Sequence, residues 1–145
     1  MILGIAPYGA WLAGRPEFSW IPGLLFIGVT SWTAGFDILY SLQDLEFDRS
    51  SGLHSIPVKI GKGRALALAV FLHALSLLAW FGVGILAGLG WVYQAGLGGC
   101  AFFLFREHWL IQRFGLAKIQ QAFFTMNAGV SLALFAAAVT ALYLR

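Results

Sequence analysis

Long apolar runs dominate this sequence and fix the class of protein to which it belongs. A membrane-spanning helix needs about 20 apolar residues, and four runs approach or exceed that length: Phe18 to Gln43, Ala65 to Ala87, Trp91 to Phe105 and Gln120 to Leu144. A soluble domain carries about 25% charged residues, whereas this chain carries 10% and is 60% hydrophobic. We therefore expect a membrane protein.

The fold follows from what a bilayer tolerates. Spanning segments must be helices or closed barrels, and the runs lack the two-residue alternation of barrel strands. A shorter run, Ile2 to Ala13, contains Pro7 and resembles the tail of a span whose first part is missing. We expect an all-α, polytopic transmembrane helix bundle, with about four full spans plus a partial N-terminal span, in which residues 1–145 form one membrane-embedded unit.

Basic residues are concentrated in two connections between the predicted spans. Of the 9 Lys and Arg residues, all but Arg15 and Arg145 lie between Asp44 and Arg64 or between Arg106 and Ile119. The positive-inside rule places both connections in the cytoplasm, so we expect a multi-pass protein of the cell (inner) membrane. No basic stripe tracks along the chain, and we expect no binding of nucleic acid.

Polar residues in the later runs have ordinary structural interpretations. His73 and Asn127 are expected to hydrogen-bond between packed helices. The string Arg106-Glu107-His108 is expected to be solvated at the membrane interface, with an internal ion pair.

Four of the 6 acidic residues, Asp37, Asp44, Glu46 and Asp48, fall close together. On a continuous helix, with about 100° per residue, the three aspartates lie within roughly 40° of one another, and Glu46 lies opposite. Carboxylates at a membrane helix need a compensating cation. An all-oxygen site suits Mg²⁺, which binds through one or two carboxylates plus substrate phosphates. Alternatively, Asp44 and Asp48 are solvated and pair with Arg49 and Lys59.

The segment after the acids, Arg49 to Gly61, mixes hydroxyl groups, a histidine and a lysine with apolar residues. It either covers a cavity mouth and donates to phosphate oxygens, or forms an ordinary cytoplasmic turn. Composition alone favours neither interpretation.

Together these residues carry a resemblance. The pattern Asp37-x-x-Tyr40-x-x-x-Asp44-x-x-x-Asp48, followed by Gly52-Leu53-His54-Ser55-Ile56-Pro57, resembles the second aspartate-rich motif and its loop in the UbiA superfamily of intramembrane prenyltransferases. The string is most similar to the 4-hydroxybenzoate polyprenyltransferases of ubiquinone and menaquinone biosynthesis. The pieces from Ala6 to Ala13 and from Phe123 to Asn127 fit the same family.

The resemblance implies the C-terminal part of a nine-helix bundle with a cavity open to lipid. There, Mg²⁺ would bind the diphosphate of a polyprenyl donor, and the prenyl group would pass to an aromatic acid such as 4-hydroxybenzoate. By motif position, Asp44 and Asp48 would ligate the metal, with Asp37 and Tyr40 in catalytic or supporting positions. The resemblance also makes Arg49 and Lys59 candidates for binding the diphosphate, and His54 and Ser55 candidates for the loop that closes the site.

One family feature is missing. The first motif, N-D-x-x-D, occurs nowhere in the 145 residues. We therefore expect a truncated or split product that is inactive alone and whose partner is a missing N-terminal half. Three alternatives stay open: a cation-transport protein that uses the aspartates, a non-catalytic membrane scaffold, and a haem, chlorophyll or archaeal-lipid prenyltransferase of the same superfamily.

Overall fold

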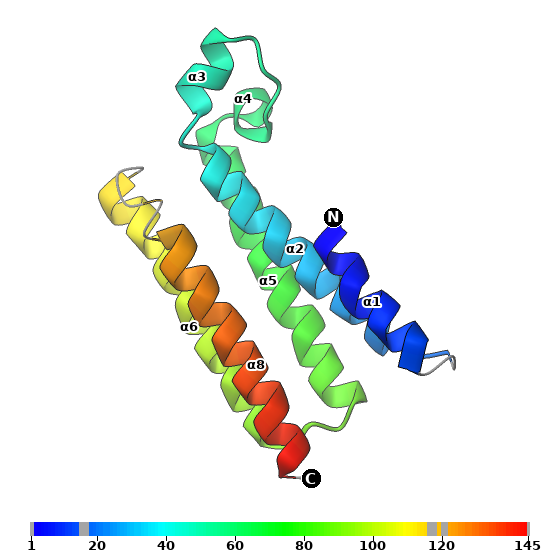
Figure 1. The fold of residues 1–145 in the computed structure, drawn as a ribbon. Helices are drawn as coiled ribbons and strands as arrows, with labels where there is room; N and C mark the ends of the chain where they lie inside the picture. The colour runs from blue at the N-terminus through cyan, green and yellow to red at the C-terminus, as the bar shows by residue number, and fades with distance from the viewer. Residues whose placement is uncertain (1, 15–17, 116–118, 120–121, 145) are drawn as a thin grey trace.

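The computed structural model describes residues 2–14, 18–115, 119 and 122–144. Within these ranges every regular element is helical, which confirms the predicted all-α class (Figure 1). The elements are α1 (Ile2–Gly14), α2 (Ile21–Ser41), α3 (Leu45–Ser50), α4 (Ile56–Ile60), α5 (Lys62–Leu86), α6 (Gly90–Phe114), the π-helical turn η2 (Ala122–Met126) and α8 (Asn127–Tyr143).

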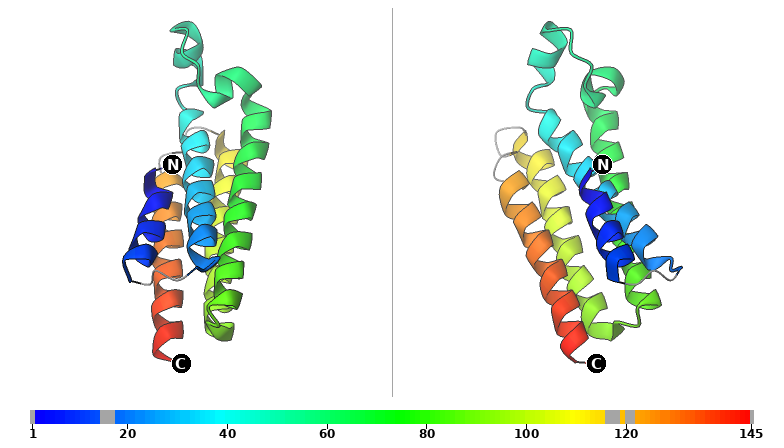
Figure 2. Two further views of the ribbon diagram at one scale, coloured as in Figure 1. Left: turned by 90° about the vertical axis from the view of Figure 1, so that its right-hand side faces the viewer. Right: turned by 45° about the vertical axis from the view of Figure 1, so that its right-hand side comes forward.

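The long helices form two groups. One contains α1, α2 and α5, the other contains α6, η2 and α8, and most contacts lie within a group, with fewer between α5 and α6 (Figures 1 and 2). The buried face of α2 includes Gly28, Ser31 and Gly35. Small residues of this kind let helix backbones approach closely in a bilayer, where lipid tails remove the hydrophobic force between helices.

Among the residues that the structure describes, three segments are long and apolar enough to cross a membrane: α2, α5 and Phe124–Tyr143. Helix α6 is as long as α5, with 25 residues, but it is the least apolar of the long helices and is not among the three. These features agree with a polytopic helical bundle.

The third predicted span differs from the structure at its end. The sequence predicts an end at Phe105, but α6 continues to Phe114, so the predicted connection from Arg106 is helical over most of its described length. The reason is that Ile111 extends the buried apolar stripe of α6 by another turn. Arg15, Lys118, Gln120 and Arg145, which entered the predictions above, lie outside the described residues.

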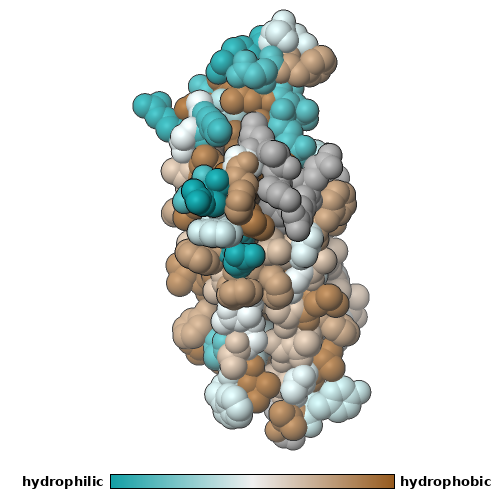
Figure 3. Space-filling model, turned by 90° about the vertical axis from the view of Figure 1, so that its left-hand side faces the viewer, coloured by the Kyte–Doolittle hydropathy of each residue, from teal (hydrophilic) through white to brown (hydrophobic). Residues whose placement is uncertain are grey.

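Residues 42–61, called here the polar cap, lie beyond the cytoplasmic end predicted for α2. They comprise a turn, α3, a loop and α4, and on the face shown in Figure 3 they form a mostly hydrophilic end, above a surface that is mainly apolar with a few hydrophilic patches. Gly61 joins α4 to α5 with φ of 82°, a left-handed conformation that residues with a Cβ rarely adopt. Because α4 is joined to α5 through this single residue and packs against both α5 and α2, the cap lies at the ends of these two helices.

Candidate functional site

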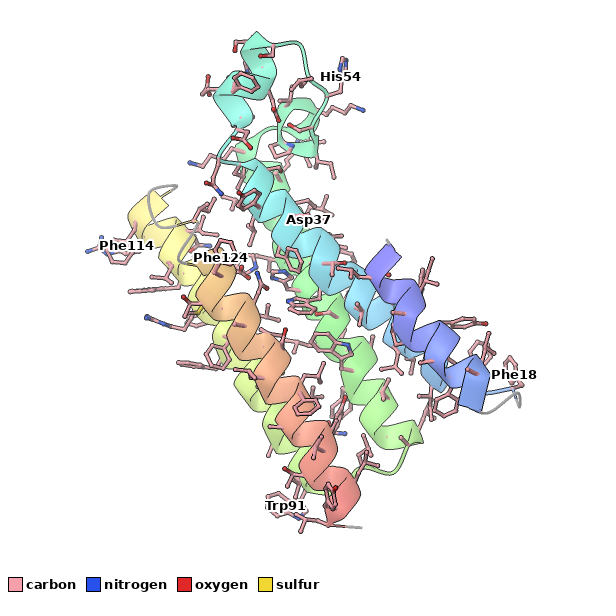
Figure 4. The ribbon with its side chains drawn as sticks, viewed as in Figure 1. Phe18, Asp37, His54, Trp91, Phe114 and Phe124 are labelled. Atoms are coloured by element: carbon pink, nitrogen blue, oxygen red, sulfur yellow. The ribbon has the colours of Figure 1, made fainter. Side chains whose placement is uncertain are left out.

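A cavity of about 300 Å³ lies where α2 meets the polar cap. Asp37, whose side chain is exposed, lines it from α2 (Figure 4). Ser55, at the start of α4, lines it from the cap. The other lining residues are Ala34, Ile38, Ser41 and Ile56. The fold thus brings together two predicted site residues that are 18 positions apart in the sequence.

The two serine hydroxyls of this cavity differ in their partners. Ser41 Oγ donates to the carbonyl oxygen of Ile38 at 2.8 Å. Ser55 Oγ is buried and has no hydrogen-bond partner within the described chain, and Ser55 makes no capping bond to α4. A buried hydroxyl without a partner is unusual in folded proteins, so Ser55 is available to bond a ligand in the cavity.

The three aspartates do not lie on one continuous helix, contrary to the prediction from their spacing. α2 ends at Ser41, and residues 42–44 form a turn closed by bonds such as Leu42 N to Leu39 O at 3.2 Å. Asp44 immediately precedes α3, and Asp48 lies inside it. The turn changes the direction of the chain, and both Leu42 and Leu45 are buried. Within the described residues, no group of three or more His, Cys, Asp or Glu is arranged to hold a metal.

The carboxylates of Asp44 and Asp48 nevertheless keep their oxygens available. Among the described side chains, neither has a hydrogen bond or ion pair. Arg49, one of the two basic residues considered as their partners, instead pairs with Glu46 at 3.5 Å, on the surface. Hard oxygen donors with open positions fit Mg²⁺, which takes only one or two carboxylates and completes its shell with water and phosphate. The donor set therefore fits the implied metal without forming a closed cage.

Of the predicted site residues, Asp37 and Ser55 line the cavity, whereas Asp44, Asp48 and the other four lie outside its wall. Tyr40, Arg49, His54 and Lys59 are all exposed. Figure 4 shows His54 on the outer side of the polar cap, pointing away from α2.

The prediction made for Glu107 from the sequence is wrong. The prediction is a solvated side chain, but Glu107 is 1% exposed, and Asn127 Nδ2 donates to its Oε1 at 3.5 Å. The missed signal is helical register: the buried residues of α6 recur every three or four positions, and Glu107 falls on that stripe. The stripe consists of Tyr93, Leu97, Cys100, Leu104, Glu107 and Ile111.

The neighbours of Glu107 also differ from the predicted interfacial group. The Arg106 guanidinium lies 4.8 Å from the centre of the Trp109 ring. His108 Nε2 lies 2.9 Å from Nδ1 of His73 on α5, which confirms the interhelical role expected of His73. Both histidines line a mostly apolar cavity of about 400 Å³ between α5 and α6, which contains none of the predicted site residues.

Comparison with known proteins shows which sequences this chain is similar to. No solved structure matches it. A protein of Francisella tularensis subsp. mediasiatica named 4-hydroxybenzoate octaprenyltransferase is 29% identical over 96% of this chain and 50% of its own length. One of the same name from Alcanivorax borkumensis is 35% identical over 67% of this chain and 32% of its own length. The chain thus spans about half the length, or less, of these curated relatives. The UbiA prenyltransferase family matches residues 1–129, and the chain belongs to that family.

Proposed function

We propose that this chain supplies one part of the active site of a membrane prenyltransferase. The enzyme transfers a polyprenyl group from a polyprenyl diphosphate to an aromatic acid such as 4-hydroxybenzoate, a step in ubiquinone or menaquinone biosynthesis. Family membership and the names of the relatives support the reaction class. The observation that carries the proposal is the cavity shared by Asp37 and Ser55, at the junction between the apolar helices and the polar cap.

The location of this cavity suits a substrate with two unlike ends. A polyprenyl chain belongs among apolar helices, whereas its diphosphate needs polar groups and positive charge. Ser55 would donate its hydroxyl hydrogen to a phosphate oxygen, and Arg49 and Lys59 of the cap would contribute positive charge. Tyr40 would lie beside the donor, and His54 would belong to the loop that covers it.

Asp44 and Asp48 would hold Mg²⁺ against the donor, with Asp37 supporting the same region from α2. The chemistry that bound Mg²⁺ would supply there is neutralisation of the charge that develops on the departing diphosphate. The apolar helices would exclude water from the electron-poor prenyl group until the aromatic ring attacks it.

The chain alone is proposed to be inactive or nearly so, because the N-D-x-x-D motif is absent from residues 1–145. Its partner would be a segment that carries this motif. We also propose that the polar cap faces the cytoplasm from the inner membrane, because Arg49, Lys59, Lys62 and Arg64 lie in it or directly after it.

The test uses a version of the enzyme that contains both aspartate motifs, assayed with a polyprenyl diphosphate and 4-hydroxybenzoate. D44N and D48N are expected to lower Mg²⁺-dependent turnover by about 100-fold or more, because each removes a ligand that acts in the transition state. The matched control is E46Q, which changes a neighbouring carboxylate that pairs with Arg49 and should leave turnover within a factor of about three. Unchanged turnover in the correctly folded D44N and D48N variants would contradict the proposal.

A further inference from the structure

A series of buried and half-buried polar side chains connects four helices. It lies on the side of α2 away from the cavity that Asp37 and Ser55 line. Trp32 Nε1 on α2 donates to Asn127 Oδ1 on α8 at 3.1 Å, and Asn127 Nδ2 donates to Glu107 Oε1 on α6 at 3.5 Å. Glu107 Oε2 lies 3.8 Å from His73 Nδ1 on α5. The imidazoles of His73 and His108 then meet at 2.9 Å. We call these five residues the polar network.

Two residues of the polar network are shielded from water, so their polar atoms depend on contacts within the protein. Glu107 is 1% exposed and His73 is 3% exposed, so neither is solvated. A carboxylate in this position is tolerable only if it keeps its proton or if a neighbouring imidazole takes that proton. Glu107 Oε2 lies 3.8 Å from His73 Nδ1 and has no hydrogen bond within the described chain, whereas Asn127 Nδ2 donates to the other carboxylate oxygen. Such a network favours one arrangement of the helices over its alternatives.

Two of its contacts hold the same turn of α2. Trp32 is hydrogen-bonded to Asn127 on one helix, and three residues later Gly35 is covered by the His73 ring from another. A methyl group at Gly35 would overlap Cδ2 and Nε2 of that ring. Asp37 follows two residues after Gly35 in the same helix. Because an α-helix is rigid over one turn, fixing this turn also fixes the direction in which Asp37 enters its cavity.

We infer that Trp32, His73, Glu107 and Asn127 are positioning residues for Asp37, acting through the backbone of α2. The inference deepens the proposed function and rests on it for its catalytic meaning. None of the four lines the Asp37 cavity. They act from the opposite side, by tying α2 to the helix group that contains α6 and α8.

The test measures hydrogen–deuterium exchange of backbone amides in the purified 145-residue chain in detergent. N127A and E107A are expected to raise exchange of the amides of residues 33–41 by about tenfold, since each removes a hydrogen bond from the network. Exchange at residues 24–28, in the first half of α2, should stay unchanged. The matched control is S131A, which alters an exposed residue one turn further along α8.

Two further variants separate positioning from general stability. E107Q keeps an oxygen that accepts from Asn127, so it should restore exchange to within about threefold of the original chain. W32F removes only the donor nitrogen and part of the ring, and it keeps the test possible if E107A does not fold. Equal exchange in N127A and S131A, or a uniform rise across all helices, would overturn the inference. The measurement needs no substrate, so its outcome stands apart from the failure or success of the prenyl-transfer assay.

Discussion

At the scale of single residues, Gly35 makes a close approach between α2 and α5. The His73 ring occupies the space that a side chain at Gly35 would need. G35A is therefore expected to lower the free energy of unfolding by about 1–3 kcal/mol through overpacking. Thermal unfolding in detergent measures this effect.

Gly23 provides the control for that substitution, because it lies on the same helix and a methyl group placed on it would meet nothing within 4 Å. G23A should leave the stability unchanged or raise it slightly, as alanine favours helix more than glycine does. Equal melting temperatures for G35A and G23A would show that the His73 ring moves aside without cost.

Ser55 offers a residue-scale prediction about binding. Its Oγ is buried without a partner among the described residues and lines the same cavity as Asp37. In an enzyme containing both motifs, S55A is expected to raise the KM for the polyprenyl diphosphate about tenfold, the cost of one hydrogen bond to a charged group. S50A is the control, because Ser50 Oγ is exposed and already bonds Phe47 O at 2.9 Å. A normal KM in S55A would remove Ser55 from the proposed diphosphate site.

At the scale of elements, the joint between α4 and α5 decides where the polar cap sits. Gly61 connects α4 to α5 with φ of 82° and ψ of 156°, so G61A forces alanine into a positive-φ conformation that is essentially limited to glycine, at a cost of about 1–3 kcal/mol. Gly63, two residues later inside α5, has open space around it. We expect lower thermal stability in G61A and no loss in G63A, and a loss of equal size in both would contradict a special role for the joint.

The positions of the long helices were predictable from the sequence, because apolar run length is imposed by the bilayer itself. The predicted runs coincide with α2, α5 and the Phe124–Tyr143 segment to within a few residues at most ends. The break at residues 42–44 was not predictable from the aspartate spacing. That turn accompanies the burial of Leu42 and Leu45 within the folded chain. A projection of the sequence onto one continuous helix does not represent the tertiary contacts that bury them.

The candidate site was predictable only in part, for a similar reason. Asp37 and Ser55 meet at one cavity, as a motif followed by its loop would require. Glu107 was misplaced because its charged neighbours suggested an interface, whereas its register on α6 put it on the buried stripe. The charged neighbours of Glu107 indicated an exposed side chain, whereas its position along the helix indicated a buried one. In the structure the side chain is buried.

At the scale of the whole molecule, the two helix groups present one aspartate-rich segment and no second one among the residues that the structure describes. Those residues contain no group of three metal-ligating side chains, and the N-D-x-x-D string is absent from all 145 residues. In the proposed site, Asp44 and Asp48 would supply carboxylate oxygens to Mg²⁺, and water and phosphate would complete its coordination. A diphosphate leaving group, however, needs its developing charge neutralised from more than one side, and the loss of one stabilising group commonly costs about 100- to 1,000-fold in rate.

The isolated chain should therefore fold without turning over. Purified in detergent or reconstituted in vesicles with Mg²⁺, polyprenyl diphosphate and 4-hydroxybenzoate, it is expected to give no prenylated product above a D44N–D48N double variant. Circular dichroism should show a helical protein at the same time, because the helix packing described above lies within this chain. Mg²⁺-dependent product from the 145 residues alone would mean that Asp37, Asp44 and Asp48 form a sufficient site, and the requirement for a partner segment would fall.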